Sequence, residues 1–197
     1  FLSEGGVAGH MNHLYDNPDL TFKKMKQIFL AASSGELKGT EKTDGQNLQL
    51  SYDIRTSSAR AARNKGNIKS GGLDAAGLAA KFGGRGALEN AFNDAFAAFE
   101  EVVGKMSIEE REEIFGPEVN VYYNAEVQDP RAANLINYDL PTLTIHRVGH
   151  NEYDRETGKA TGRDVSKNAR KLADALGRVQ GEREEGRFHV QMNAIRK

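Results

Sequence analysis

The chain has 197 residues, of which 38% are hydrophobic and 28% charged, and this composition predicts a globular fold with a substantial core. It contains neither a run of about 18 apolar residues nor a basic start leading into an apolar stretch, so we expect no membrane span and no secretory signal. Cysteine is absent and the net charge is −1, which excludes disulfides and thiolate metal sites and confines any polyanion binding to a local basic patch.

The first third of the chain predicts one helix and two strands after an irregular start. Residues 1–20 contain several Gly, Asn and Pro breakers, and Thr21 is a favourable N-cap for a helix that ends near Ala32. Strict alternation of apolar and polar residues predicts a half-buried strand at 48–54, and a short strand at 59–63 can pair with it.

The remainder predicts helices and strands in alternation. Residues 74–115 are helical in pattern, with a capping box at Ser107–Glu110 that begins the last helix of this stretch. The other predicted elements are strands at 119–127 and 143–148, a turn at 156–159, a helix from Asp164 to Val179 and a strand at 187–193. The sequence therefore predicts an α+β fold with a mostly antiparallel sheet and a helical insertion, in one domain over residues 21–197.

A short turn, Glu41-Lys42-Thr43-Asp44-Gly45, precedes the first predicted strand. A lysine beside a carboxylate and a glycine turn suits covalent chemistry, because the turn fixes the lysine and glycine lets the backbone approach a ligand closely. The amine must lose its proton to attack phosphorus, so its ordinary pKa of about 10.4 has to be lowered by burial or cationic neighbours. The alternative is an Asp-Gly hairpin turn with a solvated lysine.

Two further features follow the turn. Five basic residues and no acidic one lie between Arg55 and Lys69, which suits phosphate binding or, alternatively, a solvated basic loop. Glu126 lies on the polar side of the strand at 119–127, where a carboxylate can hold a ribose hydroxyl or a divalent metal, or simply face solvent. His10 and His13 have a spacing that could bind a metal, but a surface or capping role is the favoured interpretation.

These segments resemble motifs of the covalent nucleotidyltransferases, the superfamily of DNA ligases, RNA ligases and capping enzymes. The lysine turn is similar to the motif that carries the nucleophile, and Arg63-Asn64-Lys65-Gly66 to the Arg-x-x-Gly segment of ligases. Tyr123-Asn124-Ala125-Glu126 resembles the motif whose glutamate contacts the nucleotide. The strand 143–149 resembles the segment whose aromatic ring stacks on adenine, a place that His146 fills here.

The resemblance covers roughly residues 36–150 in order and placement, and the chain as a whole resembles phage-encoded ligase-like proteins. It implies a ligase-type, ATP-grasp-like fold, ATP as substrate (with NAD or GTP less favoured), Mg²⁺ and RNA or DNA ends as acceptors. Lys42 would attack the α-phosphate and form lysyl-AMP. The expected nucleotide-binding residues are Glu41, Thr43, Asp44, Gly45, Arg63, Lys65, Glu126 and His146, with Glu126 also the expected metal ligand.

Two later motifs of the superfamily, a Glu-Gly strand and a Lys-x-Lys, have no clear counterpart. Glu184-Glu185-Gly186 supplies a Glu-Gly pair, but no Lys-x-Lys follows it before Lys197. We therefore expect a processed or truncated chain, or a site that is incomplete.

Two other hypotheses remain open. Leu2-Ser3-Glu4-Gly5 resembles the cleavage signal used in head maturation of some tailed phages. This favours a non-catalytic virion or internal head protein that contacts other virion proteins, whereas an enzyme would act in the host cytoplasm. The third hypothesis is a nucleic-acid-binding module that uses only the basic segment.

Overall fold

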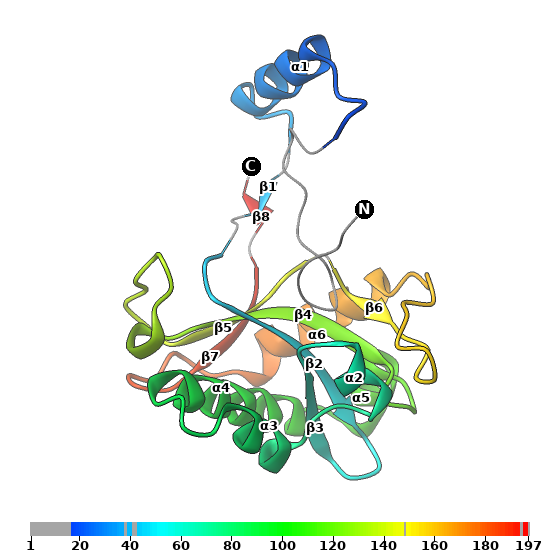
Figure 1. The fold of residues 1–197 in the computed structure, drawn as a ribbon, viewed down its shortest axis with the longest axis vertical. Coiled ribbons are helices and arrows are strands. Elements are labelled where there is room, and N and C mark those ends of the chain that lie inside the picture. The colour runs from blue at the N-terminus through cyan, green and yellow to red at the C-terminus, as the bar shows by residue number, and fades with distance from the viewer. Residues whose placement is uncertain (1–16, 38, 41–42, 148, 194, 197) are drawn as a thin grey trace.

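The computed structural model describes residues 17–37, 39–40, 43–147, 149–193 and 195–196 (Figure 1). The helices in these residues are α1 (Phe22–Ser33), α2 (Lys65–Lys69), α3 (Ala75–Phe82), α4 (Ala87–Gly104), α5 (Ile108–Phe115), the 3-10 helix η2 (Pro130–Ala132) and α6 (Ser166–Val179). The strands are β1 (Gly39–Thr40), β2 (Gln46–Asp53), β3 (Ser58–Ala62), β4 (Val121–Gln128), β5 (Thr142–Ile145), β6 (Asn151–Glu152), β7 (His189–Met192) and β8 (Ile195–Arg196).

A six-stranded sheet forms the centre of the molecule. Its order is β3-β2-β4-β5-β7, and β6 pairs with β4 beside this path. Every pair is antiparallel except β5 with β7, which is parallel. The register sets Ala125 beside Leu48 on one side and Ile145 on the other, so the apolar residues of three strands share one face. The structure thus confirms an α+β fold with a mostly antiparallel sheet.

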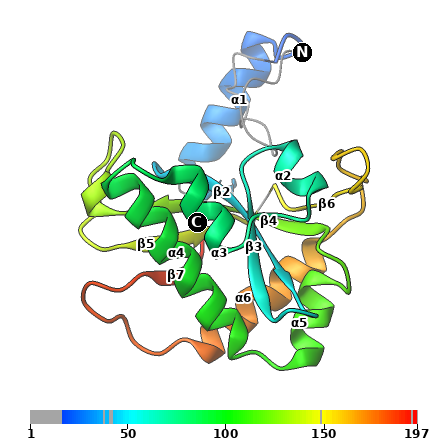
Figure 2. The ribbon, with the colours of Figure 1, turned by 60° about the horizontal axis from the view of Figure 1, so that its bottom comes forward.

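Helices α3 to α6 cover the apolar face of this sheet. Figure 2 views the molecule from this side, with α3 and α4 in front of the strands. The ring of Phe115 packs against Tyr52, Phe99 and Tyr123 at centroid distances of 5.9, 6.1 and 5.5 Å, and these four residues are buried. Their burial removes a large apolar area from water, which is the main source of stability for this layer.

The predicted helix caps are confirmed at α1 and α5 and displaced at α6. Thr21 accepts a hydrogen bond from the Lys24 amide, and Ser107 forms the predicted capping box at α5. At α6 the N-cap is Val165, not Asp164 as predicted. The Asp164 carboxylate still accepts a hydrogen bond from the Ser166 amide at 2.8 Å, so it satisfies one amide of the first turn.

The second face of the sheet is polar in sequence but largely buried. Gln49 and Ser51 alternate with the core residues of β2, yet both are fully buried. The prediction of a half-buried strand is therefore wrong for β2, which is covered on both faces. Near β3, part of this cover is a small apolar cluster of Ala62, Ile68, Val119, Tyr122 and Tyr153.

Helix α1 stands apart from the sheet, on the side opposite α3 and α4 (Figure 1). The helix has no buried residue, and Phe22 is 89% exposed. Between α1 and the sheet lie β1 and β8, which pair antiparallel and which the sequence did not predict. Residues 1–16 of the predicted irregular segment lie outside the described residues.

Candidate functional site

An amide cluster occupies the polar face of β2 and β4. The Oδ1 atom of Asn124 accepts hydrogen bonds from Asn47 Nδ2 at 2.6 Å and from Gln49 Nε2 at 2.9 Å. The Oε1 atom of Gln49 is buried and has no hydrogen-bond partner among the described residues. A buried acceptor without a partner costs about 1–3 kcal/mol, so this face is suited to a polar ligand or an ordered water molecule.

Glu126 is the next residue on this face of β4. The sheet register sets it between Asn47 on β2 and Thr144 on β5. Its Oε1 lies 3.6 Å from His146 Nε2, while its Oε2 is buried and has no partner among the residues that the structure describes. His146 is held beyond the end of β5 by its amide, which donates to the Asn124 carbonyl at 2.9 Å. Glu126 therefore keeps one carboxylate oxygen for a hydroxyl group or a cation.

Arg63 approaches the same region from the end of β3. Its Nη1 donates to the Asn47 carbonyl at 2.6 Å, and its guanidinium lies 5.4 Å from the ring centroid of Phe92 and 5.9 Å from that of Phe82. Burial lowers the pKa of Arg63, and the nearby charge of Glu126 opposes this shift. An arginine remains charged even so, and this cation is therefore fixed beside Glu126.

The lysine turn is described from Thr43 onward, because Glu41 and Lys42 lie outside the described residues. The Thr43 hydroxyl is buried and has no partner among the described residues. A Cβ atom added to Gly45 would lie 2.6 Å from the Val127 carbonyl oxygen. Glycine is thus required because the turn packs closely against β4. The sequence predicted a close approach to a ligand, whereas the close approach in the structure is to a strand.

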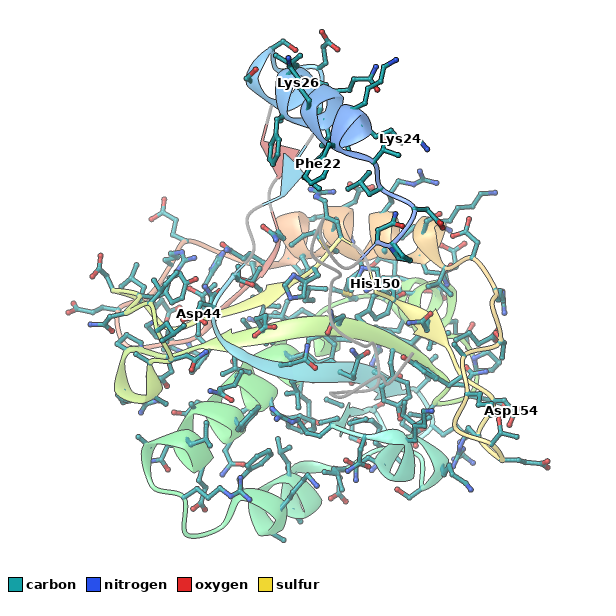
Figure 3. The ribbon with its side chains drawn as sticks, turned by 45° about the horizontal axis from the view of Figure 1, so that its top comes forward. Phe22, Lys24, Lys26, Asp44, His150 and Asp154 are labelled. Atoms are coloured by element: carbon teal, nitrogen blue, oxygen red, sulfur yellow. The ribbon has the colours of Figure 1, made fainter. Side chains whose placement is uncertain are left out.

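Asp44 joins this turn to the segment before β5 through hydrogen bonds. Its Oδ2 accepts hydrogen bonds from the amides of Leu135 and Ile136, each at 2.6 Å, and its Oδ1 accepts one from Asn134 Nδ2 at 2.8 Å. The Asp44 amide donates to the Tyr138 hydroxyl at 2.9 Å. Figure 3 shows Asp44 at the start of β2, on the side of the sheet turned away from α3 and α4. Asp44 therefore has a structural task, and its nucleotide-binding role stays a prediction.

The basic segment is distributed over several elements and is not a single loop. Arg60 lies on β3 and pairs with Asp53 at 3.2 Å, and Arg55 is exposed at the β2–β3 turn. Lys65 and Lys69 are exposed on α2. The side chain of Lys65 forms no hydrogen bond or ion pair with another described residue, so the structure does not bring it to Glu126. Its nucleotide-binding role also stays a prediction.

His150 belongs to the site but was assigned no role from sequence. Its Nδ1 accepts a hydrogen bond from the Asn124 amide at 3.3 Å, and its ring centroid lies 5.0 Å from that of Tyr123. Burial lowers the pKa of His150 to about 4, so the imidazole is neutral at pH 7 and carries its proton on Nε2. That buried Nε2 has no partner among the described residues. The only sequence signal was its closeness to His146.

A cavity of about 330 Å³ opens beside Thr43, where β4, β5 and β7 run side by side. Thr144 Oγ1 donates to Gln128 Oε1 at 2.6 Å and accepts from Gln191 Nε2 at 3.4 Å, and these three side chains line the cavity. Arg183 also lines it. The sequence alternation predicted the strands, but the cavity depends on the parallel pairing of β5 with β7, which alternation does not reveal.

The described residues contain no group of three or more His, Asp or Glu side chains that could hold a metal ion. His10 and His13 lie outside the described residues. One carboxylate together with substrate phosphates is a common donor set for Mg²⁺, and Glu126 with its open oxygen fits that description. No helix in the described part of the chain is long and apolar enough to cross a membrane.

No family model, curated protein or solved structure matches this chain. The arrangement itself sets a guanidinium and a carboxylate beside Asn47, shortly after the lysine turn, and an imidazole beside that carboxylate. These groups can bind a ligand that carries both anionic oxygens and hydroxyl groups.

Proposed function

We propose that this chain is an ATP-dependent nucleotidyltransferase of the RNA or DNA ligase type, in which Lys42 becomes covalently adenylated. The proposal is carried by the proximity of three residues that are distant in sequence. Arg63 donates to the Asn47 carbonyl, Glu126 is the register partner of Asn47, and His146 lies beside Glu126. Asn47 follows Lys42 closely in the chain. The motif resemblance assigns a nucleotide contact to each of the three residues, and their proximity in the fold supports a ligand that they share.

The reaction is a phosphoryl substitution. The neutral Lys42 amine attacks the α-phosphorus of ATP, a P–N bond forms, and the bond from that phosphorus to the bridging oxygen breaks. Pyrophosphate leaves with the electron pair, and the amine gives up a proton. The fixed charge of Arg63 attracts the phosphates.

Glu126 and His146 hold the nucleoside. The open Oε2 of Glu126 accepts a ribose hydroxyl or binds Mg²⁺, which when bound neutralises charge on the transferring phosphoryl group. The imidazole of His146 lies beside this carboxylate and presents a flat ring for the base. The adenylate would then pass to an RNA or DNA end, the acceptor class that the motif resemblance implies.

A labelling experiment tests the proposal. The protein is incubated with Mg²⁺ and ATP labelled at the α-phosphate, and then denatured. We expect label that remains on the protein and that disappears in Lys42→Ala. The control is Lys81→Ala, which removes an exposed lysine on α3, the helical side of the sheet, and should retain the label.

The absence of any adduct with ATP, GTP or NAD would contradict the proposal. Binding of RNA or DNA that weakens steeply with salt, without an adduct, would instead support the nucleic-acid-binding hypothesis.

A further inference from the structure

Arg183 is an arginine whose charge is oriented but not neutralised. It lies in the segment between α6 and β7, where its Nη1 donates to Thr142 Oγ1 at 3.1 Å and its Nη2 to Gln191 Oε1 at 3.0 Å. Both acceptors are neutral, and none of the ion pairs among the described residues includes Arg183. Burial lowers the pKa of His189, and the charge of Arg183 adds to this shift. The guanidinium is therefore held in place for an anion.

Arg187, in the same segment, has the opposite arrangement. Its Nη1 pairs with Glu184 at 2.8 Å and its Nη2 with Glu101 at 2.7 Å. Two carboxylates satisfy this arginine, so it has little charge to offer a ligand. Arg187 is for this reason a matched control for Arg183.

The cavity beside Arg183 supplies further donors. The Thr43 hydroxyl is buried and has no partner among the described residues. Tyr138 accepts a hydrogen bond from Asp44, which leaves its own O–H to donate. Both line the cavity, whose volume of about 330 Å³ is on the order of ten water volumes. A guanidinium and two hydroxyl donors suit an oxyanion, which only accepts hydrogen bonds.

Charge around the cavity mostly favours an anion. Arg147 donates to the carbonyl of Asn193, another lining residue, at 2.6 Å and brings a second cation close by. Asp139 is the one carboxylate among the described lining residues, and it is exposed. The charge of Asp139 repels an anion, so we expect anion binding to be stronger when this carboxylate is removed.

We propose that this cavity is a pyrophosphate subsite and that Arg183 is the residue that holds the anion. The choice of pyrophosphate rests on the proposed function, because Thr43 follows Lys42 directly and pyrophosphate is the leaving group of the lysine adenylation. The preference for a phosphate-type oxyanion rests on the cavity itself.

Calorimetric titration with pyrophosphate tests the subsite. We expect the wild type to bind and Arg183→Gln to bind about 10- to 100-fold more weakly, because it loses charge-assisted hydrogen bonds. Arg183→Lys, which keeps the charge without the fork, should lie between them. Arg187→Gln should bind as the wild type does, and Asp139→Asn should bind more tightly.

Three results would overturn the subsite: no pyrophosphate binding by the wild type, equal binding by Arg183→Gln, or equal weakening by Arg183→Gln and Arg187→Gln. Its failure is distinguishable from that of the proposed function. A Lys42 adduct with Arg183-independent pyrophosphate binding removes only the subsite. Arg183-dependent binding without an adduct supports the subsite and removes the adenylation.

Discussion

His150 is a buried imidazole that the fold keeps neutral. Its Nδ1 accepts the Asn124 amide, and the ring packs beside Tyr123. Burial lowers its pKa in the folded protein to about 4, below the ordinary value of 6.5. As the pH falls below 6.5, His150 therefore becomes protonated in the unfolded chain while it is still neutral in the folded protein. This difference lowers the free energy of unfolding as the pH falls toward 4.

We predict that the free energy of unfolding falls by about 2 kcal/mol between pH 7 and pH 5 because of His150. The contribution is fully present above pH 6.5 and is lost as the pH falls toward 4. Urea denaturation at both pH values, for the wild type and for His150→Gln, measures it. Gln keeps a polar acceptor but does not titrate, so its pH dependence should be shallower. An identical loss in both proteins would contradict the prediction.

Gly45 is fixed by a backbone contact. Its added Cβ would lie 2.6 Å from the Val127 carbonyl oxygen, and this strand cannot move without disturbing the sheet. We predict that Gly45→Ala lowers the free energy of unfolding by about 1–3 kcal/mol and weakens adenylation, because the lysine turn is displaced.

The control for Gly45 is Gly177 on α6, where an added Cβ meets nothing within 4 Å. Gly177→Ala should stabilise the protein by about 1 kcal/mol through helix propensity. Chemical denaturation of both variants checks the pair. Equal effects of the two substitutions would show that the close approach at Gly45 has no energetic consequence.

Sequence motifs singled out candidate residues such as Glu126, but they did not reveal roles that depend on contacts distant in the chain. Glu126 was placed correctly on the polar face of its strand, because alternation fixes the side of a strand. The structural task of Asp44 was missed, since its partners lie about ninety residues further along the chain. Arg183 was missed because its distinguishing property is the neutrality of its acceptors, Thr142 and Gln191, and local sequence does not encode that.

At the scale of elements, segments with a clear apolar period were predicted, whereas some of the shortest elements were not. The repeated apolar positions of α4 and the capping box of α5 identify those helices without knowledge of the fold. Strands β1, β6 and β8 are two residues long, too short for a period to be detected, and helix α2 buries only Ile68 and so has no apolar stripe. The parallel pairing of β5 with β7 follows from how α6 returns the chain, which is a tertiary property.

Helix α1 contributes apolar side chains to the surface and none to the core. Phe29 is 58% exposed on this helix, whereas Phe99 on α4 is fully buried. We predict that Phe29→Ala changes the free energy of unfolding by less than about 0.5 kcal/mol, and that Phe99→Ala lowers it by about 3–5 kcal/mol.

Thermal or urea denaturation of the two alanine variants compares them directly. Both substitutions remove the same ring from a helix, so the comparison isolates burial. A loss for Phe29→Ala as large as that for Phe99→Ala would mean that the exposed face of α1 is covered in the folded protein.

At the scale of the whole molecule, one face of the central sheet packs in the core and the other carries the candidate site. The apolar face joins helices α3 to α6 in the main core, which fixes the register of β2, β4 and β5. That register sets Asn47, Glu126 and Thr144 side by side on the other face. The stability of the helical layer thus positions the polar groups from which a function is inferred.

Peptide mapping of the adduct tests the central claim most directly. The full chain is incubated with ATP and Mg²⁺, digested, and analysed by mass spectrometry for AMP attached to lysine. The proposed function predicts AMP on the peptide that contains Lys42, with formation reduced in Glu126→Gln. An unmodified Lys42 peptide after incubation with ATP, GTP or NAD, or AMP attached instead at Lys65, would contradict it.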